Sequence, residues 1–466
     1  MSELITELES LLGENGVLYG ERLAERQFPG GGAFPTGTLE PLALVRPRST
    51  QEVSEILRVC HAAGQPVVPH GGLTGLVEGA ASIKREVAIT MERMNKIEEV
   101  DIESRTITVQ AGVPLQLVQE EAEKAGMLFP LDLGARGTAT IGGNVSTNAG
   151  GNRVIRYGMM RDQVLGMEVV LADGTIISTM KKIIKNNTGY DIKQFFIGAE
   201  GTLGVVTRLV LRVRPMPISQ NMALVAVNEF SQVTTFLNHV DRALGGTLSA
   251  FEVLWKDYYK LVTTPPAAGS PPLVHDYNYY ILLEAMGGSL EADADRFVEV
   301  LSKSLEDEVI IDAVVAQSQS ERDAMWAIRD DVGQVAQNWP IFTFDVSVSL
   351  DEMESYVEEL KNNLAVKWND HSCMIFGHLG DGNLHIIVGM GDDSKEAKKA
   401  VEEMVYQGLT TRGGSVSAEH GIGLQKRDYL SWSRSAEEIE LMQSIKKALD
   451  PSGIMNPGKI FGYLAV

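Results

Sequence analysis

Residues 137–151 constrain the fold more than any other segment, because fifteen consecutive positions hold almost only glycine and small side chains with hydroxyl or amide groups. Such a stretch can wrap around a flat polar ligand and hydrogen-bond its edges. A second glycine-rich loop, residues 70–79, follows a short predicted strand at residues 66–69. Glycines there allow several backbone N–H groups to converge on an anion. Ordinary turns would explain either loop alone, but the two together favour a pyrophosphate site.

The net charge of −21 over 466 residues argues against nucleic acid or an anionic membrane as the main partner, because both require a basic surface. The charge is uneven, however. Residues 131–220 hold 11 Lys and Arg against 6 Asp and Glu, and 13 of the 46 glycines. This segment suits one pyrophosphate and one small acid. The chain is too long for one hydrophobic core, so two or three domains are expected.

The N-terminus and the cysteine content predict a cytoplasmic protein. Residues 1–5 are acidic where a signal peptide would be basic, and no run of 18 apolar residues predicts a membrane span. The two cysteines, Cys60 and Cys373, cannot form a disulfide framework and suit a reducing compartment.

Two common nucleotide-binding motifs do not fit the sequence. No G-x-G-x-x-G follows a predicted strand, which disfavours a nicotinamide-binding domain. Residues 453–459 imitate a phosphate-binding loop, but Ile460 replaces the Ser or Thr that would hold Mg²⁺, and too little chain follows for the required helix.

Hydrophobic periodicity predicts an α+β chain with a domain boundary near Pro215 and Pro217. Before this boundary, Ser49 or Thr50 is placed to cap a helix. After it, apolar strands alternate with long acidic helices whose charged faces are solvated. The segments expected are strands at 43–45, 105–109 and 280–283, and helices at 114–125, 291–305, 351–360 and 436–449.

Three of the eight histidines lie between residues 378 and 420. His378 and His385 flank a Gly-Asp-Gly turn between two apolar runs, which predicts a hairpin whose imidazoles reach one point. Two histidines and one carboxylate form a common open site for zinc or another divalent metal, and Glu419 is the candidate carboxylate. Its neighbour His420 is a candidate general base, because imidazole titrates near neutral pH. Taken singly these would be ordinary residues; as a set they favour a metal site.

Seven motifs, taken in order, resemble those of the flavin-dependent D-2-hydroxyacid dehydrogenases of the vanillyl-alcohol oxidase/p-cresol methylhydroxylase superfamily. This group includes D-lactate, D-2-hydroxyglutarate and glycolate dehydrogenases, and the resemblance covers nearly the whole chain. The motifs are residues 69–76, 141–151 with 156–158, 185–191, 198–204, 378–385, 419–423 and 450–459.

The resemblance implies a bipartite FAD-binding domain of the p-cresol methylhydroxylase type over residues 1–216. It further implies an α+β, ferredoxin-like cap domain over residues 217–421 that carries the metal site. Residues 422–466 then form a C-terminal helical segment that returns to the FAD domain.

The resemblance also assigns roles to single residues. Its catalytic and metal-ligating matches are His420 as base, Arg329 as the grip on the substrate α-carboxylate, Asn383 near the metal, and His378, His385 and Glu419 as ligands. An arginine fork suits a carboxylate better than lysine would. The matches to FAD are His70, Gly71, Gly72, Leu73, Thr74, Gly75, Leu76, Pro130, Gly137, Thr138, Ile141, Gly142, Asn144, Thr147, Asn148, Gly151, Gly204, Val206 and Asn456.

Two departures from the family pattern concern FAD. His70 stands where the family has arginine, which removes one charge from the pyrophosphate site but leaves the backbone donors. Leu73 stands where some relatives in the superfamily attach FAD covalently through histidine. We therefore expect FAD to be bound non-covalently.

Two further departures concern the substrate. Glutarate-type members carry a lysine and a threonine for the distal carboxylate, and Thr343 and Gly333 stand at those positions. A buried second carboxylate without a partner would cost several kcal/mol. The sequence therefore favours D-lactate or a neutral or aromatic hydroxyacid such as D-mandelate, with D-2-hydroxyglutarate or D-malate as the alternative.

The sequence thus predicts an FAD- and metal-dependent dehydrogenase that oxidises a D-2-hydroxyacid to its 2-oxoacid. Zinc is the first candidate metal, with manganese and iron as alternatives. A non-catalytic flavin-binding subunit of a glycolate oxidase-type complex is a less favoured reading, because such a subunit has no reason to keep the metal set. The electron acceptor, a quinone or an electron-transfer flavoprotein, and the oligomeric state, for which a homodimer is one candidate, stay open.

Overall fold

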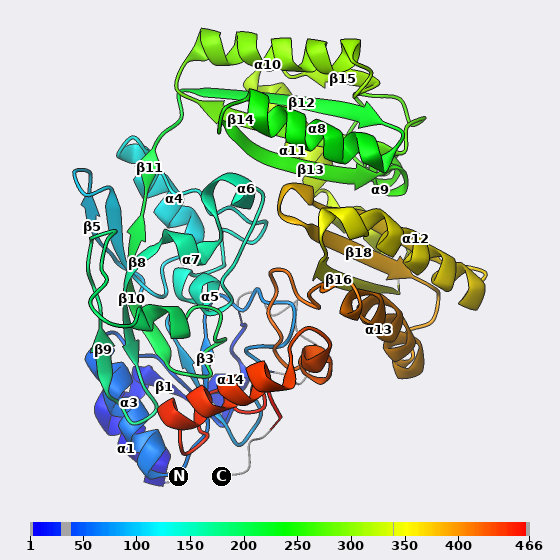
Figure 1. The fold of residues 1–466 in the computed structure, drawn as a ribbon. Coiled ribbons are helices and arrows are strands. Elements are labelled where there is room, and N and C mark those ends of the chain that lie inside the picture. The colour runs from blue at the N-terminus through cyan, green and yellow to red at the C-terminus, as the bar shows by residue number, and fades with distance from the viewer. Residues whose placement is uncertain (1–2, 29–38, 339, 463–466) are drawn as a thin grey trace. The chain divides into compact units, whose positions relative to one another are not determined.

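Two structural units make up the chain. The computed structural model describes residues 3–28, 39–338 and 340–462 (Figure 1). Unit 1 comprises residues 1–150, 158–216 and 419–466, and unit 2 comprises residues 151–157 and 217–418. The sequence-based boundaries were placed after residues 216 and 421. In the structure the chain leaves unit 2 and returns to unit 1 after Ala418, and residues 151–157 group with unit 2.

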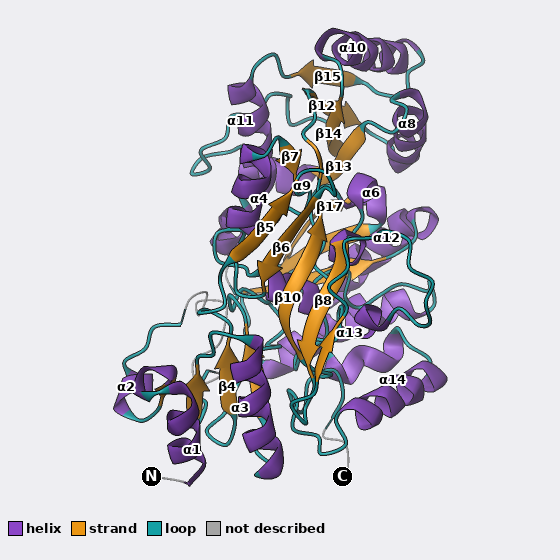
Figure 2. Cartoon of the chain, turned by 90° about the vertical axis from the view of Figure 1, so that its left-hand side faces the viewer, coloured by secondary structure: helices purple, strands orange, loops and turns teal. Residues whose placement is uncertain are grey.

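Besides a two-stranded sheet of β7 (Met127–Leu128) and β11 (Arg214–Pro215), unit 1 contains two larger sheets. One has four strands in the order β1-β2-β4-β3, of which β2, β4 and β3 are parallel, and the other has five antiparallel strands in the order β5-β6-β10-β8-β9. Figure 2 shows β6, β10 and β8 side by side in the second sheet. The strands are β1 (Val17–Leu18), β2 (Ala43–Val45), β3 (Val67–His70), β4 (Val87–Thr90), β5 (Ile97–Asp101), β6 (Thr106–Gln110), β8 (Val164–Val170), β9 (Ile176–Ser178) and β10 (Val205–Arg212).

The helices of unit 1 follow the predicted hydrophobic pattern. Helix α3 (Thr50–Ala62) begins after Ser49, whose hydroxyl accepts a hydrogen bond from the Glu52 N–H at 3.1 Å, so the expected cap is confirmed. Helix α4 (Leu115–Lys124) buries one stripe of side chains, as its amphipathic sequence predicts. The expected strands at 43–45 and 105–109 correspond to β2 and β6.

The C-terminal tail of unit 1 pairs with strand β3. After helix α14 (Ala436–Leu449), the Val67 N–H donates to the Ile454 carbonyl, and the Asn456 N–H donates to the Val67 carbonyl, both at 2.8 Å. The tail therefore lies beside the strand that leads into the first glycine loop.

Unit 2 is built on a seven-stranded antiparallel sheet in the order β15-β12-β14-β13-β17-β18-β16. The predicted hairpin is confirmed, because β17 ends at His378 and β18 carries His385 as its third residue. The expected strand at 280–283 lies within β14. The strands are β12 (Ser219–Val227), β13 (Leu248–Trp255), β14 (Tyr279–Gly287), β15 (Asp312–Val315), β16 (Ile341–Ser347), β17 (Ser372–His378) and β18 (Asn383–Gly389).

Helices cover both faces of this sheet (Figure 1). On one face, Phe251 of β13 and Phe344 of β16 contact the aromatic rings of Phe236 and Tyr406. On the other face, Tyr258 stacks on Phe376 at 4.1 Å between ring centroids. The helices of unit 2 are α8 (Phe230–Ala243), α9 (Lys256–Val262), α10 (Leu290–Glu306), α11 (Gln319–Asp330), α12 (Leu350–Lys367) and α13 (Lys395–Thr410), besides the short α6 (Val154–Tyr157).

The elements of both units together confirm the predicted α+β class. Among the described residues, no helix combines the length and the apolar composition that crossing a bilayer requires.

Candidate active site

The two glycine loops predicted to bind FAD pack directly against each other in unit 1. A Cβ atom on Gly72 would lie 2.0 Å from the Thr138 carbonyl oxygen, and one on Gly71 would lie 2.7 Å from the Thr140 hydroxyl oxygen. Only glycine allows so close an approach of the two segments. Residues 70–76 and 137–151, which are far apart in sequence, therefore contribute to one site.

The surroundings of the two loops hold strained backbone and buried polar atoms. Leu73, Asn148 and Asn456 adopt left-handed conformations with φ of 57°, 50° and 41°. Such conformations cost energy in residues other than glycine and occur mostly where the surroundings enforce them. The Asn144 Nδ2 and Asn456 Oδ1 atoms are buried and make no hydrogen bond to the described residues. These features fit a polar cofactor such as FAD.

The remaining residues matched to FAD differ in exposure. Leu76 is half exposed, and Gly75, Gly137 and Thr138 are exposed, whereas Gly151 groups with unit 2. The others lie at buried or half-buried positions of unit 1: Thr74, Pro130, Ile141, Gly142, Thr147, Gly204 and Val206.

His70 is a buried, neutral residue in the structure. Burial, together with the charges of Lys459 and Arg26, lowers the pKa of its imidazole to about 4, although a hydrogen bond with the Ala80 backbone opposes the shift. Its Nε2 atom lies 3.4 Å from the Ser82 hydroxyl oxygen. At neutral pH His70 therefore carries no positive charge for a pyrophosphate.

The predicted metal ligands of unit 2 lie on one face of its sheet. The register pairs Glu252 with His378, and His385 with both Phe376 and Asp345, so these side chains share a face. This is the face on which Tyr258 stacks. This face of the sheet therefore carries both stacked aromatic rings and the carboxylates and imidazoles of the predicted site.

Glu252 fixes the orientation of His378. The His378 Nδ1–H donates to Glu252 Oε1 at 2.6 Å, and the Arg329 Nε–H donates to Glu252 Oε2 at 2.8 Å. Burial opposes ionisation of Glu252, but the charges of His378 and Arg329 and the hydrogen bonds from both side chains together outweigh burial and lower the pKa of Glu252 to about 2. The Nε2 atom of His378 is thereby directed away from Glu252, as in carboxylate–histidine–metal arrangements.

The two histidines are spaced as metal ligands. His378 Nε2 lies 3.4 Å from His385 Nε2. Two nitrogens bound to one tetrahedral zinc at about 2.0–2.1 Å lie about 3.3 Å apart, so the spacing fits one ion. Arg329 donates from Nη2 to His378 Nε2 at 3.3 Å, which places its guanidinium beside the same point.

Asn383 and Asp381 lie in the turn between the two histidines. Asn383 is 3% exposed, and neither the Nδ2 nor the Oδ1 atom of its side chain bonds to the described residues. Burial raises the pKa of Asp381 to about 6, with Glu252 and Asp345 adding to the effect and His378 opposing it. An amide with two unused groups beside a histidine pair is suited to contact a polar ligand.

Glu419 and His420 begin the segment that returns to unit 1. Ala418, the last residue of unit 2, donates its N–H to Asp345 Oδ2 at 3.1 Å. Within unit 1 the Glu419 carboxylate occupies the place that a Cβ atom on Gly150 would need, 2.2 Å from Oε1. Gly150 therefore has to be glycine for Glu419 to adopt this position.

Glu200 anchors the chain just after His420. Its Oε1 accepts the Ile422 N–H at 2.7 Å, and its Oε2 accepts the Gly423 N–H at 2.8 Å. Burial raises the pKa of this carboxyl group, and the two N–H groups oppose that shift. Glu200 itself has a φ of 50°, so the loop holds a strained residue to make this contact.

The Glu200→Gln variant should be destabilised by about 1–3 kcal/mol. A glutamine side chain has only one oxygen, so its NH2 group would face one of the two backbone N–H groups, which would then have no acceptor. Thermal unfolding of the FAD-loaded protein measures this. The Glu78→Gln variant is the control, because Glu78 contacts the same segment through Gln425 at an exposed position. Equal stability of the two variants would contradict the anchoring role.

Sequence reasoning missed Glu252 and Glu284, two buried acids on the same face of the sheet of unit 2, and Glu200 in unit 1. A signal existed for the first two, because each acidic residue interrupts an otherwise apolar strand. A buried acid in such a strand needs a partner and marks a candidate site. No comparable signal existed for Glu200, because its partners are backbone groups more than 220 residues away.

Comparisons with protein families agree with this geometry. Residues 41–180 match the family "FAD binding domain", and residues 216–460 match the family "FAD linked oxidases, C-terminal domain". A solved structure also has the same fold. Substrate-bound p-cresol methylhydroxylase aligns with a TM-score of 0.75 at 16% identity, over 99% of this chain and 96% of that one.

Curated relatives are similar over most of the chain. A probable mitochondrial D-2-hydroxyglutarate dehydrogenase from Oryza sativa subsp. indica is 38% identical over 98% of this chain and 82% of its own length. A D-2-hydroxyglutarate dehydrogenase from Xanthomonas citri pv. viticola is 37% identical over 91% and 90%. A putative mitochondrial D-lactate dehydrogenase from Schizosaccharomyces pombe is 37% identical over 89% and 81%. With both family matches, these relatives show that the chain belongs to the FAD-linked oxidases and is an FAD-dependent D-2-hydroxyacid dehydrogenase.

Proposed function

We propose that this dehydrogenase oxidises D-2-hydroxyglutarate to 2-oxoglutarate. The observation that carries the proposal is the similarity to relatives named D-2-hydroxyglutarate dehydrogenases, from a plant and a bacterium, over nine-tenths or more of the chain. This favours the dicarboxylate over the D-lactate or D-mandelate that the sequence departures suggested. The residue set also favours a catalytic protein over a non-catalytic subunit, because the histidine pair and its supporting carboxylate are intact.

His378, His385 and Glu419 are the proposed ligands of a divalent metal, with zinc as the first candidate. The 3.4 Å spacing of the imidazoles supports the first two. The N–H of Ala418 donates to Asp345, the residue paired with His385 in the sheet. Because Glu419 directly follows Ala418, this contact supports Glu419 as the third ligand. A carboxylate in this position completes a two-histidine, one-carboxylate set with open positions for substrate.

The proposed mechanism divides the work among the chain's own residues. When bound, FAD would supply a hydride acceptor and the metal a Lewis acid for the substrate hydroxyl. Arg329, held rigidly by Glu252, binds the substrate carboxylate through its guanidinium fork. His420 takes the hydroxyl proton as general base. Asn383 orients the bound substrate with its buried amide. FAD is held without a covalent bond, because the Leu73 side chain has no nucleophile.

D-lactate is the second candidate substrate. The Schizosaccharomyces pombe relative carries that name. In addition, Thr343 lies exposed on β16 and Gly333 has no side chain, so neither position supplies a cation for a second carboxylate. A monocarboxylate would need no such cation.

Flavin reduction by a panel of substrates tests the proposal. D-2-hydroxyglutarate should be preferred to D-lactate and D-mandelate by about tenfold or more in kcat/KM, because a charge-assisted contact to a second carboxylate contributes about 1.5–3 kcal/mol. Chelation should slow reduction, and added zinc should restore it. Preference for a monocarboxylate would refute the proposed substrate, and full activity after proven metal removal would refute the metal.

Three further expectations stay predictions. The first is a cytoplasmic location, whereas relatives from Oryza sativa and Schizosaccharomyces pombe are named mitochondrial. The second is a quinone or an electron-transfer flavoprotein as electron acceptor, and the third is assembly as a homodimer.

A further inference from the structure

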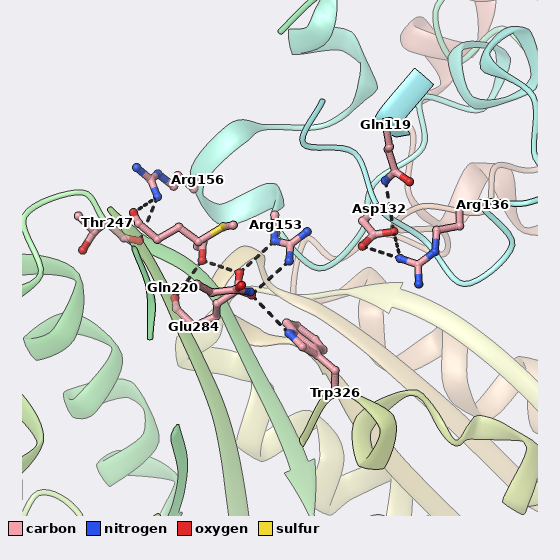
Figure 3. A network of polar contacts seen from close by, with 11 residues as sticks. Gln119, Asp132, Arg136, Arg153, Arg156, Gln220, Thr247, Glu284 and Trp326 are labelled. Atoms are coloured by element: carbon pink, nitrogen blue, oxygen red, sulfur yellow. Dashed lines mark hydrogen bonds and ion pairs between the residues drawn. The ribbon is translucent and has the colours of Figure 1, made fainter. Parts of the chain in front are cut away.

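Arg153 forms an ion pair with Glu284 that the proposed mechanism does not use. The Arg153 Nε–H donates to Glu284 Oε1 at 3.0 Å, and its Nη2–H donates to Glu284 Oε2 at 3.2 Å (Figure 3). Arg153 belongs to residues 151–157, which group with unit 2. A bidentate pair of this kind fixes the guanidinium in one plane.

Glu284 is held as firmly as Glu252. Its side chain is fully buried, and it accepts hydrogen bonds from Ser249 at 2.6 Å, Gln220 at 2.7 Å and Trp326 at 3.4 Å. Burial opposes its ionisation, but the charge of Arg153 and the hydrogen bonds from Arg153, Ser249 and Gln220 together outweigh burial and lower the pKa of Glu284. The carboxylate therefore stays charged and keeps Arg153 in place.

The two Arg–Glu pairs lie on the same face of the sheet of unit 2. The register pairs Glu284 of β14 with Ala250 of β13, and Glu252 lies two residues after Ala250 in β13. Cβ atoms in such diagonal positions lie about 7–8 Å apart. Helix α11 shows independently that the two glutamates are close, because Trp326 bonds to Glu284 and Arg329, three residues later, bonds to Glu252. Side chains at this spacing are neighbours on a helix.

We propose that Arg153 binds the distal carboxylate of the substrate while Arg329 binds the α-carboxylate. This inference rests on the proposed function. The carboxylate carbons of a five-carbon diacid are joined by four C–C bonds of about 1.5 Å each, so they lie about 5 Å apart. Two arginines bound to glutamates that are diagonal neighbours about 7–8 Å apart on one sheet face are compatible with this length. Arg153 thus supplies the cation that Thr343 and Gly333 do not supply.

A charge-balanced double variant tests this role. Arg153→Gln alone would leave Glu284 buried without its cation and could unfold the protein. The Arg153→Gln/Glu284→Gln variant removes both charges and keeps two hydrogen-bonding amides. The test compares D-2-hydroxyglutarate with D-2-hydroxyvalerate, which has the same carbon chain but no distal carboxylate. The ratio of their kcat/KM values should fall by about 10- to 100-fold, through KM for the diacid.

Arg156→Gln is the matched control. Arg156 carries the same charge on the same short segment, but it donates to the backbone carbonyls of Thr247 and Met286. Its substitution should leave the substrate ratio unchanged. An unchanged ratio in the double variant, or a parallel loss for both substrates, would overturn the role of Arg153 and leave the proposed function standing. Wild-type preference for D-2-hydroxyvalerate would refute the proposed function, and this inference with it.

Discussion

The His420→Ala variant should lose reduction of the flavin by substrate while FAD stays bound. If His420 is the general base, its removal should slow the step by about 10²- to 10⁴-fold, the usual contribution of a positioned base. FAD should stay bound, because the contacts that join the two FAD loops lie at Gly71, Gly72 and residues 138–143. Anaerobic mixing with substrate, followed by flavin absorbance, measures the rate, and the spectrum before mixing measures bound FAD.

His371→Ala provides the control for removing an imidazole. His371 precedes strand β17, and its Nδ1 atom lies 2.9 Å from the Trp368 carbonyl oxygen, outside the proposed site. This variant should reduce its flavin at nearly the wild-type rate. Reduction at the wild-type rate by His420→Ala would show that another group takes the proton. Loss of FAD from that variant would assign His420 a structural role instead.

Local structure could be predicted from the sequence because its causes are local. The Ser49 cap, the amphipathic stripe of α4 and the hairpin around His378 and His385 each depend on residues within one or two turns of chain. The two histidines could also be placed together, because antiparallel strands joined by a short turn bring their ends to one place. These elements were predicted with the right type and nearly the right ends.

The supporting residues of the candidate site could not be predicted in the same way. Glu252 meets His378 across 126 positions through the order of the strands in the sheet, and Arg153, which lies in no strand, meets Glu284 across 131 positions. A sequence pattern reports which faces are apolar but not which strands become neighbours. The missing cation at Thr343 consequently suggested a monocarboxylate, whereas an arginine from a distant segment lies on the same sheet face.

The Glu252→Gln variant should lose both metal affinity and stability. The Glu252 carboxylate accepts from His378 and from Arg329, and its pKa of about 2 keeps it charged at neutral pH. Removing the charge from a fully buried pair destabilises a protein by about 3–5 kcal/mol. Loss of the group that orients a ligating histidine usually lowers metal affinity by about 10- to 100-fold. Thermal unfolding measures the first effect, and zinc retained after dialysis against a graded chelator measures the second.

The Asp330→Asn variant separates these effects from a general disturbance of Arg329. Asp330 accepts from Arg329 Nη1 at 3.1 Å, but its side chain is about half exposed. An exposed ion pair contributes only about 0–1 kcal/mol, so this variant should keep both its stability and its zinc. Glu252→Gln should differ from it on both measures, because only Glu252 contacts the imidazole as well. If Glu252→Gln retained zinc as firmly as Asp330→Asn, then His378 would not depend on Glu252 for its orientation, and the proposed metal site would lose its main structural support.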